Sequence, residues 1–412
     1  MSSGTLIIGT GQAGFQVAAS LRAEGYQEPV TLIGDEPHIP YQRPPLSKGF
    51  LLGKENSESI ELRPAAFYRD HAVELLCGET ASSVDRAGRQ VRLASGRTAA
   101  YDKLVLATGA RNRPLPVPGA KLDGVLYLRS LSEAAALKQR LEQAREIVVI
   151  GGGFIGLEVA AVASTLGKRV TVLEALPRLM SRVVAPIISN FYVQLHSSKG
   201  VHVACNAAVT EILGSQGKVQ SVKLSDGTAH PADLVMVGIG VVPNLELARD
   251  AGLAVGNGIV VDEKLQTGDD NIYAVGDCAE HPNPFAAARV RLESVQNAAD
   301  QGQCAAERIL GRDGCYSSVP WFWTDQFDIK LQMAGISAGH DRAVTRGSAQ
   351  NRKLSVFYFK QNRLIAIDSI NRPLDHILGR KLLAASTRLT PEQADDESFD
   401  LKQLAQTERR TA

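Results

Sequence analysis

Two glycine-rich turns in this chain have the residue types and spacing that bind a pyrophosphate. The first, Gly9-Thr10-Gly11-Gln12-Ala13-Gly14, follows the apolar run 5–8, and the second, Gly151-Gly152-Gly153-Phe154-Ile155-Gly156, follows the apolar run 147–150. The first glycine permits a tight bend, the second lets phosphates approach the backbone, and the third packs the following helix against the strand. The amide end of that helix stabilises the negative charge. We therefore expect each turn to bind a dinucleotide.

An acidic residue follows the second strand of each strand–turn–helix–strand unit. Asp35 lies twenty-one residues after Gly14, and Glu174 lies eighteen residues after Gly156. A carboxylate at this position can accept hydrogen bonds from both ribose hydroxyls. Glu174 has no arginine directly beside it and would repel a 2′-phosphate, which favours NADH over NADPH; we expect Arg178 to make a surface or pyrophosphate contact.

Two further strand ends complete the first site. An apolar run ends in Ala107-Thr108-Gly109, and another, 272–275, ends in Gly276-Asp277, which suits the ribityl chain of a flavin. Together with the paired turns, these segments resemble the two-dinucleotide flavoprotein disulfide reductase superfamily, which implies that the first nucleotide is FAD. The positioning elements that we expect are strands at 5–8, 30–33, 104–106, 147–150, 170–173 and 272–275, and helices at about 15–24 and 154–166.

The resemblance implies an α/β fold class. It consists of two Rossmann-like dinucleotide-binding domains, with the NAD domain inserted into the FAD domain, and a C-terminal α+β interface domain. The expected boundaries are 1–113 and 245–319 for the FAD domain, 114–244 for the NAD domain and 320–412 for the interface domain.

The cysteines argue against thiol chemistry beside the flavin. Segment 40–49, where disulfide reductases of this superfamily place a redox-active pair, contains no cysteine. The spacing of the five cysteines allows no zinc or iron–sulfur site, so we expect no metal, and any cluster must belong to a partner. Electrons must then leave the flavin directly. The cysteines are Cys77, Cys205, Cys278, Cys304 and Cys315.

Three segments narrow the resemblance. They are Pro40 to Lys48 (PYQRPPLSK), Glu293 to Ala298 (ESVQNA) and Pro320 to Gln326 (PWFWTDQ). With the two turns, they make nearly the whole chain similar to the NADH-dependent ferredoxin reductases of bacterial oxygenase systems. This similarity implies an FAD oxidoreductase that passes electrons from NADH, one at a time, to a [2Fe–2S] ferredoxin. That ferredoxin would supply a haem-thiolate monooxygenase or a ring-hydroxylating dioxygenase.

The resemblance also assigns site residues. Lys48 would lie beside flavin N5 and pair with Glu158, because an ammonium favours reduced flavin and a carboxylate offsets the cost of burying it. Trp323 would lie near the flavin on the ferredoxin side. The other FAD contacts would be Gly9, Gly11, Ala13, Gly14, Asp35, Arg43, Ala81, Ala107, Thr108, Gly109, Arg129, Asp277 and Val295. The other NAD contacts would be Gly153, Ile155, Gly156, Glu174, Arg182 and Gly240.

Charge and hydropathy limit the partners. The chain has 45 basic and 44 acidic residues, a net charge of +1, so we expect neither nucleic acid nor an anionic membrane as a partner. The apolar stretch 147–167 is interpreted as a buried strand and helix rather than a membrane span. We expect a cytoplasmic monomer whose ferredoxin is acidic, with Arg308 and Arg312 either meeting that ferredoxin or solvated. The acidic segment 395–397 is expected to be mobile.

Two rival functions fit the same cofactor sites. One is a reductase of rubredoxin, a quinone or another small acceptor. The other is a redox-sensing binding protein that resembles apoptosis-inducing factor.

Overall fold

The computed structural model describes residues 3–407, and its contacts divide the chain into two compact units. Segment 43–56 belongs to the same compact unit as the second glycine turn and the C-terminal sheet. The three-domain boundaries expected from the sequence stay a prediction. The first unit is Met1–Gln42, Ser57–Arg111 and Val242–Phe322. The second unit is Arg43–Asn56, Asn112–Val241 and Trp323–Ala412.

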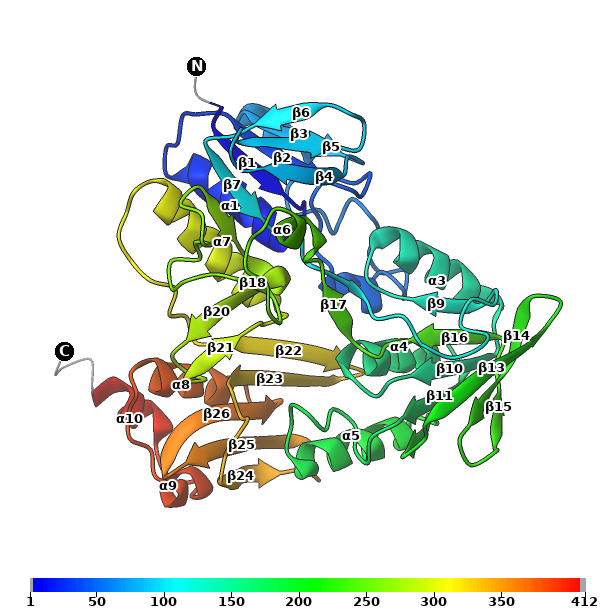
Figure 1. The fold of residues 1–412 in the computed structure, drawn as a ribbon. Helices are drawn as coiled ribbons and strands as arrows, with labels where there is room; N and C mark the ends of the chain where they lie inside the picture. The colour runs from blue at the N-terminus through cyan, green and yellow to red at the C-terminus, as the bar shows by residue number, and fades with distance from the viewer. Residues whose placement is uncertain (1–2, 408–412) are drawn as a thin grey trace. The chain divides into compact units, whose positions relative to one another are not determined.

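A five-stranded parallel sheet forms the centre of the first unit, in the order β19-β7-β1-β2-β3. Its three inner strands are apolar and almost fully buried, as expected where helices or loops cover both faces. Helices α1 and α7 pack against each other (Figure 1), and Gly302 permits their close approach. The bounds are β1 (Thr5–Ile8), β2 (Val30–Gly34), β3 (Val73–Cys77), β7 (Lys103–Leu106), β19 (Ile272–Ala274), α1 (Gln12–Ala23) and α7 (Val295–Ile309).

Smaller elements surround this sheet. Strands β4, β5 and β6 form one three-stranded sheet, and β18, β20 and β21 form another. The bounds are β4 (Ala81–Asp85), β5 (Gln90–Leu93), β6 (Thr98–Ala100), β8 (Ala110–Asn112), β17 (Val241–Pro243), β18 (Ile259–Val260), β20 (Ala279–Asn283), β21 (Ala288–Val290), α2 (Ala65–Asp70), α6 (Glu246–Asp250) and η2 (Gly276–Cys278).

The second unit repeats the parallel arrangement, in the order β12-β11-β10-β16-β9. Helix α4 follows β10 and is buried almost all round, while the short helix η1 packs on α3 and α4. The bounds are η1 (Pro44–Ser47), β9 (Val125–Tyr127), α3 (Leu131–Gln143), β10 (Glu146–Ile150), α4 (Phe154–Thr165), β11 (Arg169–Glu174), α5 (Pro186–Ser198), β12 (His202–Cys205), β13 (Val209–Ser215), β14 (Lys218–Leu224), β15 (Ala229–Pro231) and β16 (Leu234–Val237).

An antiparallel sheet completes the second unit, in the order β22-β23-β26-β25-β24. Helix α8 packs on β23 and β26 (Figure 1), and its buried leucines join the alternating apolar faces of these strands in one core. The bounds are β22 (Trp321–Gln326), β23 (Ile329–Gly335), β24 (Arg342–Ser348), β25 (Lys353–Lys360), β26 (Arg363–Ile370), α8 (Pro373–Ala384), α9 (Pro391–Asp395) and α10 (Leu401–Thr407).

The fold class predicted from the sequence is confirmed: two parallel dinucleotide-type sheets and a C-terminal α+β part are present. Stretch 147–167 forms the buried strand β10 and helix α4, and no helix within residues 3–407 is long and apolar enough to cross a membrane. The buried Arg346 guanidinium of β24 donates to the carbonyls of Asp396, Glu397 and Phe399. The expected mobility of the acidic segment stays a prediction.

Candidate dinucleotide and redox sites

The first glycine turn has the geometry of a phosphate cradle. Gly9 has φ +119°, and a Cβ there would lie 2.0 Å from the Ala107 carbonyl oxygen; a Cβ at Gly14 would lie 2.0 Å from the Gly9 oxygen. Chain packing therefore requires both glycines. Gly11 is different, because a Cβ there would meet no atom within 4 Å. Gly11 is the N-cap of α1, and no side chain caps this end, so the open space lies where the helix amides can receive a pyrophosphate.

The second turn repeats this pattern residue for residue. Gly151 has φ +108° and a virtual Cβ 2.4 Å from the Gly238 oxygen, and that of Gly156 lies 2.2 Å from the Gly151 oxygen. The virtual Cβ of Gly153 again meets nothing within 4 Å, and Gly153 is the N-cap of α4 without a side-chain cap. Both turns therefore fit a dinucleotide pyrophosphate, because no atom of the chain fills the space beside Gly11 or beside Gly153.

The carboxyl ends of the first sheet gather the predicted FAD residues at one edge, because its strands are all parallel. Asp35 follows β2 and is exposed, while Asp277 lies in η2, three residues after the end of β19, and is half-buried. Thr108 follows β7 and is fixed by Asn244, since its hydroxyl donates to the Asn244 carbonyl at 2.8 Å and the Asn244 amide donates back at 2.8 Å.

Three more of these residues lie on neighbouring elements. Ala13 is in the first turn of α1, and Val295 begins α7, whose N-cap hydroxyl accepts from the third residue of the helix. Ala81 begins β4, two residues after Glu79, whose amide donates to the Gly34 oxygen at the end of β2. The first unit thus holds Gly9, Gly11, Ala13, Gly14, Asp35, Ala81, Ala107, Thr108, Gly109, Asp277 and Val295.

Backbone amides position the carboxylate of Glu174 at the end of β11. Gly152 N donates to Oε2 at 2.7 Å, and Leu176 N donates to Oε1 at 2.8 Å. The Arg178 guanidinium makes hydrogen bonds within the protein: it donates to the Ser181 and Val184 carbonyls and to the hydroxyl of Ser189 on α5. The expected surface or pyrophosphate contact of Arg178 is thus replaced by a structural one. Because Arg178 is occupied by these hydrogen bonds, the Glu174 carboxylate suits a ribose with a free 2′-hydroxyl rather than a 2′-phosphate.

The other predicted NAD residues lie around the same sheet edge. Gly240 follows β16 with φ +101° and open space where a Cβ would be. Ile155 and Arg182 are exposed, and Ile155 is 42% exposed although it is apolar. The second unit thus holds Arg43, Lys48, Arg129, Gly153, Ile155, Gly156, Glu158, Glu174, Arg182, Gly240 and Trp323.

The predicted ion pair forms within the second unit. Lys48 Nζ lies 2.8 Å from Glu158 Oε2, and the Lys48 and Glu158 side chains are 22% and 2% exposed. Glu158 lies on the buried helix α4, and Lys48 directly follows η1, which begins with Pro44 and Pro45. Arg43, at the N-terminal end of η1, donates to the Arg129 carbonyl at 2.6 Å. Two predicted flavin contacts, Arg43 and Arg129, are therefore joined directly.

Four residues around Glu158 were missed by sequence reasoning. Ser47 donates to Glu158 Oε2 at 2.5 Å and Thr324 donates to Oε1 at 2.6 Å. Behind Thr324 lie Gln326 and His196, both buried. Ser47, Thr324 and Gln326 belong to the segments that carry the family resemblance, but His196 gives no local signal.

Both arginines expected at a docking surface or in solvent have partners or are buried. Arg308 is 9% exposed on α7. Arg312 pairs with Glu24 at 2.7 Å. Cys278, which follows the Gly276-Asp277 motif, is fully buried as a free thiol. Residues 3–407 contain no cluster of side chains suited to a metal ion.

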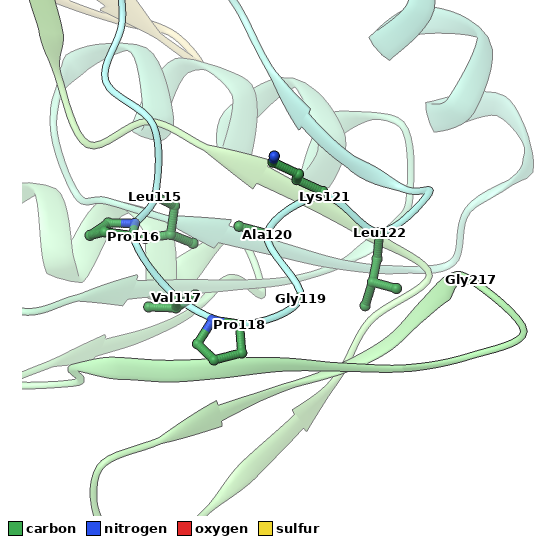
Figure 2. Close-up of a pocket in the computed structure, with 9 residues that line it drawn as sticks. All are labelled: Leu115, Pro116, Val117, Pro118, Gly119, Ala120, Lys121, Leu122 and Gly217. Atoms are coloured by element: carbon green, nitrogen blue, oxygen red, sulfur yellow. The ribbon is translucent and has the colours of Figure 1, made fainter.

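A separate open pocket of about 570 Å³ lies along loop 115–122, beside Gly217 (Figure 2). Lys121 is the only ionisable residue that lines it, and the rest of the lining is apolar or glycine. The glycine turns and the Lys48–Glu158 pair do not contribute to this pocket. We assign no chemistry to it.

Two parallel sheets, each with a glycine cradle and a ribose-type carboxylate, define a two-dinucleotide oxidoreductase. The comparisons with known proteins agree. The pyridine nucleotide-disulphide oxidoreductase family model matches residues 4–302, and the reductase C-terminal model matches residues 321–405. The chain belongs to the pyridine nucleotide-disulphide oxidoreductase family and carries the reductase C-terminal domain. It is an FAD-dependent oxidoreductase, and FAD and NADH are its cofactors.

Its similar relatives cover nearly the whole chain. Rhodocoxin reductase of Rhodococcus erythropolis is 50% identical over 397 residues, which is 96% of this chain and 93% of that protein. Putidaredoxin reductase of Pseudomonas putida is 43% identical over 404 residues, covering 97% and 96%. The solved ferredoxin reductase for the CYP199A2 system of Rhodopseudomonas palustris superposes with a TM-score of 0.96 at 49% identity, covering 98% and 100%.

Proposed function

We propose that this protein carries electrons from NADH through FAD to a [2Fe–2S] ferredoxin of an oxygenase system. The observation that carries this proposal is the Lys48–Glu158 pair at 2.8 Å, because it places a cation in a largely buried position and holds it there. The similarity to ferredoxin reductases supports the type of acceptor. A solved relative, 42% identical with a TM-score of 0.95, is a covalent complex of putidaredoxin reductase with putidaredoxin.

The chain's own residues perform the binding. The cradle at Gly11 and the carboxylates of Asp35 and Asp277 hold FAD, and the cradle at Gly153 and the carboxylate of Glu174 hold NADH. The helix amides that follow each cradle neutralise phosphate charge. No side chain caps the N-terminus of α1 or of α4.

The chemistry that FAD supplies when bound is acceptance of a hydride from NADH and release of the electrons one at a time. Lys48 contributes a positive charge that favours an electron-rich neighbour. Glu158 balances that charge in the buried region and, with the Pro44 carbonyl at 3.3 Å, fixes the position of Nζ. Three donors contact the Glu158 carboxylate: Lys48 Nζ, the Ser47 hydroxyl and the Thr324 hydroxyl.

The partner and setting complete the proposal. Within residues 3–407 the five thiols are free, which fits a reducing cytoplasm. The iron–sulfur cluster belongs to the partner. The ferredoxin is acidic, the reductase acts as a monomer, and the final acceptor is a monooxygenase or a dioxygenase. Ferredoxin reduction that slows steeply with salt would support the acidic partner, and salt independence would contradict it.

The Lys48→Met variant tests the role of the ion pair. Methionine keeps the length of the side chain without its charge, so FAD should remain bound while the flavin is reduced by NADH at least about tenfold more slowly. Anaerobic stopped-flow absorbance at the flavin band measures the rate. Lys54→Met, in the same segment and exposed, is the matched control and should react like the parent protein. Full-rate reduction of Lys48→Met would show that the pair has no part in the reaction.

A further inference from the structure

Glu158 is the end point of a continuous chain of buried hydrogen bonds. Thr324 Oγ1 lies 2.6 Å from Glu158 Oε1, Gln326 Nε2 lies 3.3 Å from Thr324 Oγ1, and His196 Nε2 lies 2.8 Å from Gln326 Oε1. The side chains of Thr324, Gln326 and His196 are at most 1% exposed. The chain joins α4, β22 and α5, and all four residues belong to the second unit.

Chemistry fixes the direction of every bond in this chain. An ionised carboxylate only accepts, so the Thr324 hydroxyl must donate to Glu158. The hydroxyl proton is then used, and Thr324 can only accept from the amide group of Gln326. The Gln326 carbonyl therefore faces His196, and His196 must donate from Nε2.

The unused ring nitrogen of His196 supports the same direction. Among residues 3–407, His196 Nδ1 is buried and has no hydrogen-bond partner, as expected of a bare acceptor nitrogen but not of an N–H. Burial lowers the pKa of His196, although the bond to Gln326 acts against this. The imidazole is therefore neutral and carries its proton on Nε2.

We propose that Thr324, Gln326 and His196 are positioning residues that orient the Glu158 carboxylate toward Lys48. Their donors all point toward the carboxylate, so their dipoles add in the direction that stabilises a negative charge. Ser47 donates to the other oxygen, which leaves Glu158 with three donors in a site that is 2% exposed. This inference rests on the proposed function of the Lys48–Glu158 pair.

Nitrogen-15 NMR of the FAD-bound protein tests the direction of the chain without any turnover. The protein is labelled with ¹⁵N-histidine, and the His196 signals are assigned by their loss in His196→Gln. We expect a bare Nδ1 and a protonated Nε2 at neutral pH. A proton on Nδ1, or on both nitrogens, would overturn the inference, because His196 would then not be the Nε2–H donor that the proposed chain requires.

Kinetics of flavin reduction test its consequence. Thr324→Val removes one donor from Glu158 at nearly constant volume, and we expect about tenfold slower reduction by NADH with unchanged NADH affinity. Thr324→Ser restores the hydroxyl and should recover the rate to within about twofold. Thr345→Val makes the same change on β24, outside this hydrogen-bond chain, and should leave the rate of flavin reduction unchanged.

The two proposals fail in distinguishable ways. If Lys48→Met slows reduction and Thr324→Val does not, the positioning role is wrong and the ion pair keeps its function. If neither variant slows reduction, both the positioning role and the proposed function of the pair are wrong.

Discussion

The ion pair makes a quantitative prediction that a double-mutant cycle can test. Lys48→Met leaves Glu158 buried and charged with only its two hydroxyl donors, and removing one partner of a buried pair costs about 3–5 kcal/mol. Glu158→Gln leaves Lys48 with a side chain that is 22% exposed, so water can solvate the ammonium and the cost should be about 1–2 kcal/mol.

The double variant should lose less stability than the sum of the two. Methionine and glutamine leave no uncompensated charge, so we expect a coupling energy of about 2 kcal/mol. Urea unfolding of the FAD-bound proteins, monitored by tryptophan fluorescence, measures how much each single variant and the double variant change the free energy of unfolding relative to the parent protein. Glu142→Gln on the exposed side of α3 is the control for the charge change alone. Additivity within about 0.5 kcal/mol would refute the pair as a coupled, buried interaction.

Further predictions concern the nucleotide sites and one buried acid. Glu174→Arg should weaken NADH binding and ease NADPH binding, and an unchanged ratio of dissociation constants would contradict the ribose assignment. Gly153→Ala should fold normally, since the added Cβ would meet no atom within 4 Å, but should bind NADH more weakly. Gly156→Ala should lower the thermal unfolding midpoint, because its Cβ would lie 2.2 Å from the Gly151 carbonyl oxygen. Equal thermal midpoints for the two variants would argue against this packing. Burial raises the pKa of Asp368 to about 7, so the folded protein favours the protonated carboxyl. The protonated carboxyl therefore contributes fully to the free energy of unfolding below about pH 4, and this contribution is lost as the pH rises toward 7. Asp368→Asn should lessen this decline in a series of urea midpoints across that range, and an unchanged slope would exclude Asp368 as its source.

Most of the framework could be predicted from the sequence because its signals are local. Strand β1 matches its expected range, and β10 and α4 differ from theirs by one residue at one end, since apolar runs beside glycine turns define both ends. The Lys48–Glu158 pair was predicted from the family resemblance, and the structure places the two side chains in contact. Its use in the reaction stays a prediction.

What the sequence could not supply depends on contacts between distant residues. Thr324 reaches Glu158 across 166 positions, and His196 reaches Gln326 across 130, with no periodic pattern to indicate either contact. Arg308 was open to either interpretation because arginines near a helix end are usually exposed, yet here it is buried. Arg346 contacts the acidic segment, again about fifty residues away in the sequence.

The central claim is electron transfer from NADH through FAD to a [2Fe–2S] ferredoxin. Anaerobic stopped-flow absorbance tests it directly, by mixing the FAD-bound protein with NADH and then with an acidic [2Fe–2S] ferredoxin, or with a rubredoxin in parallel. The account predicts rapid bleaching of the flavin and then fast reduction of the ferredoxin. A long-lived charge-transfer species that no ferredoxin discharges would contradict it and favour a redox sensor, and discharge by rubredoxin alone would show a different acceptor.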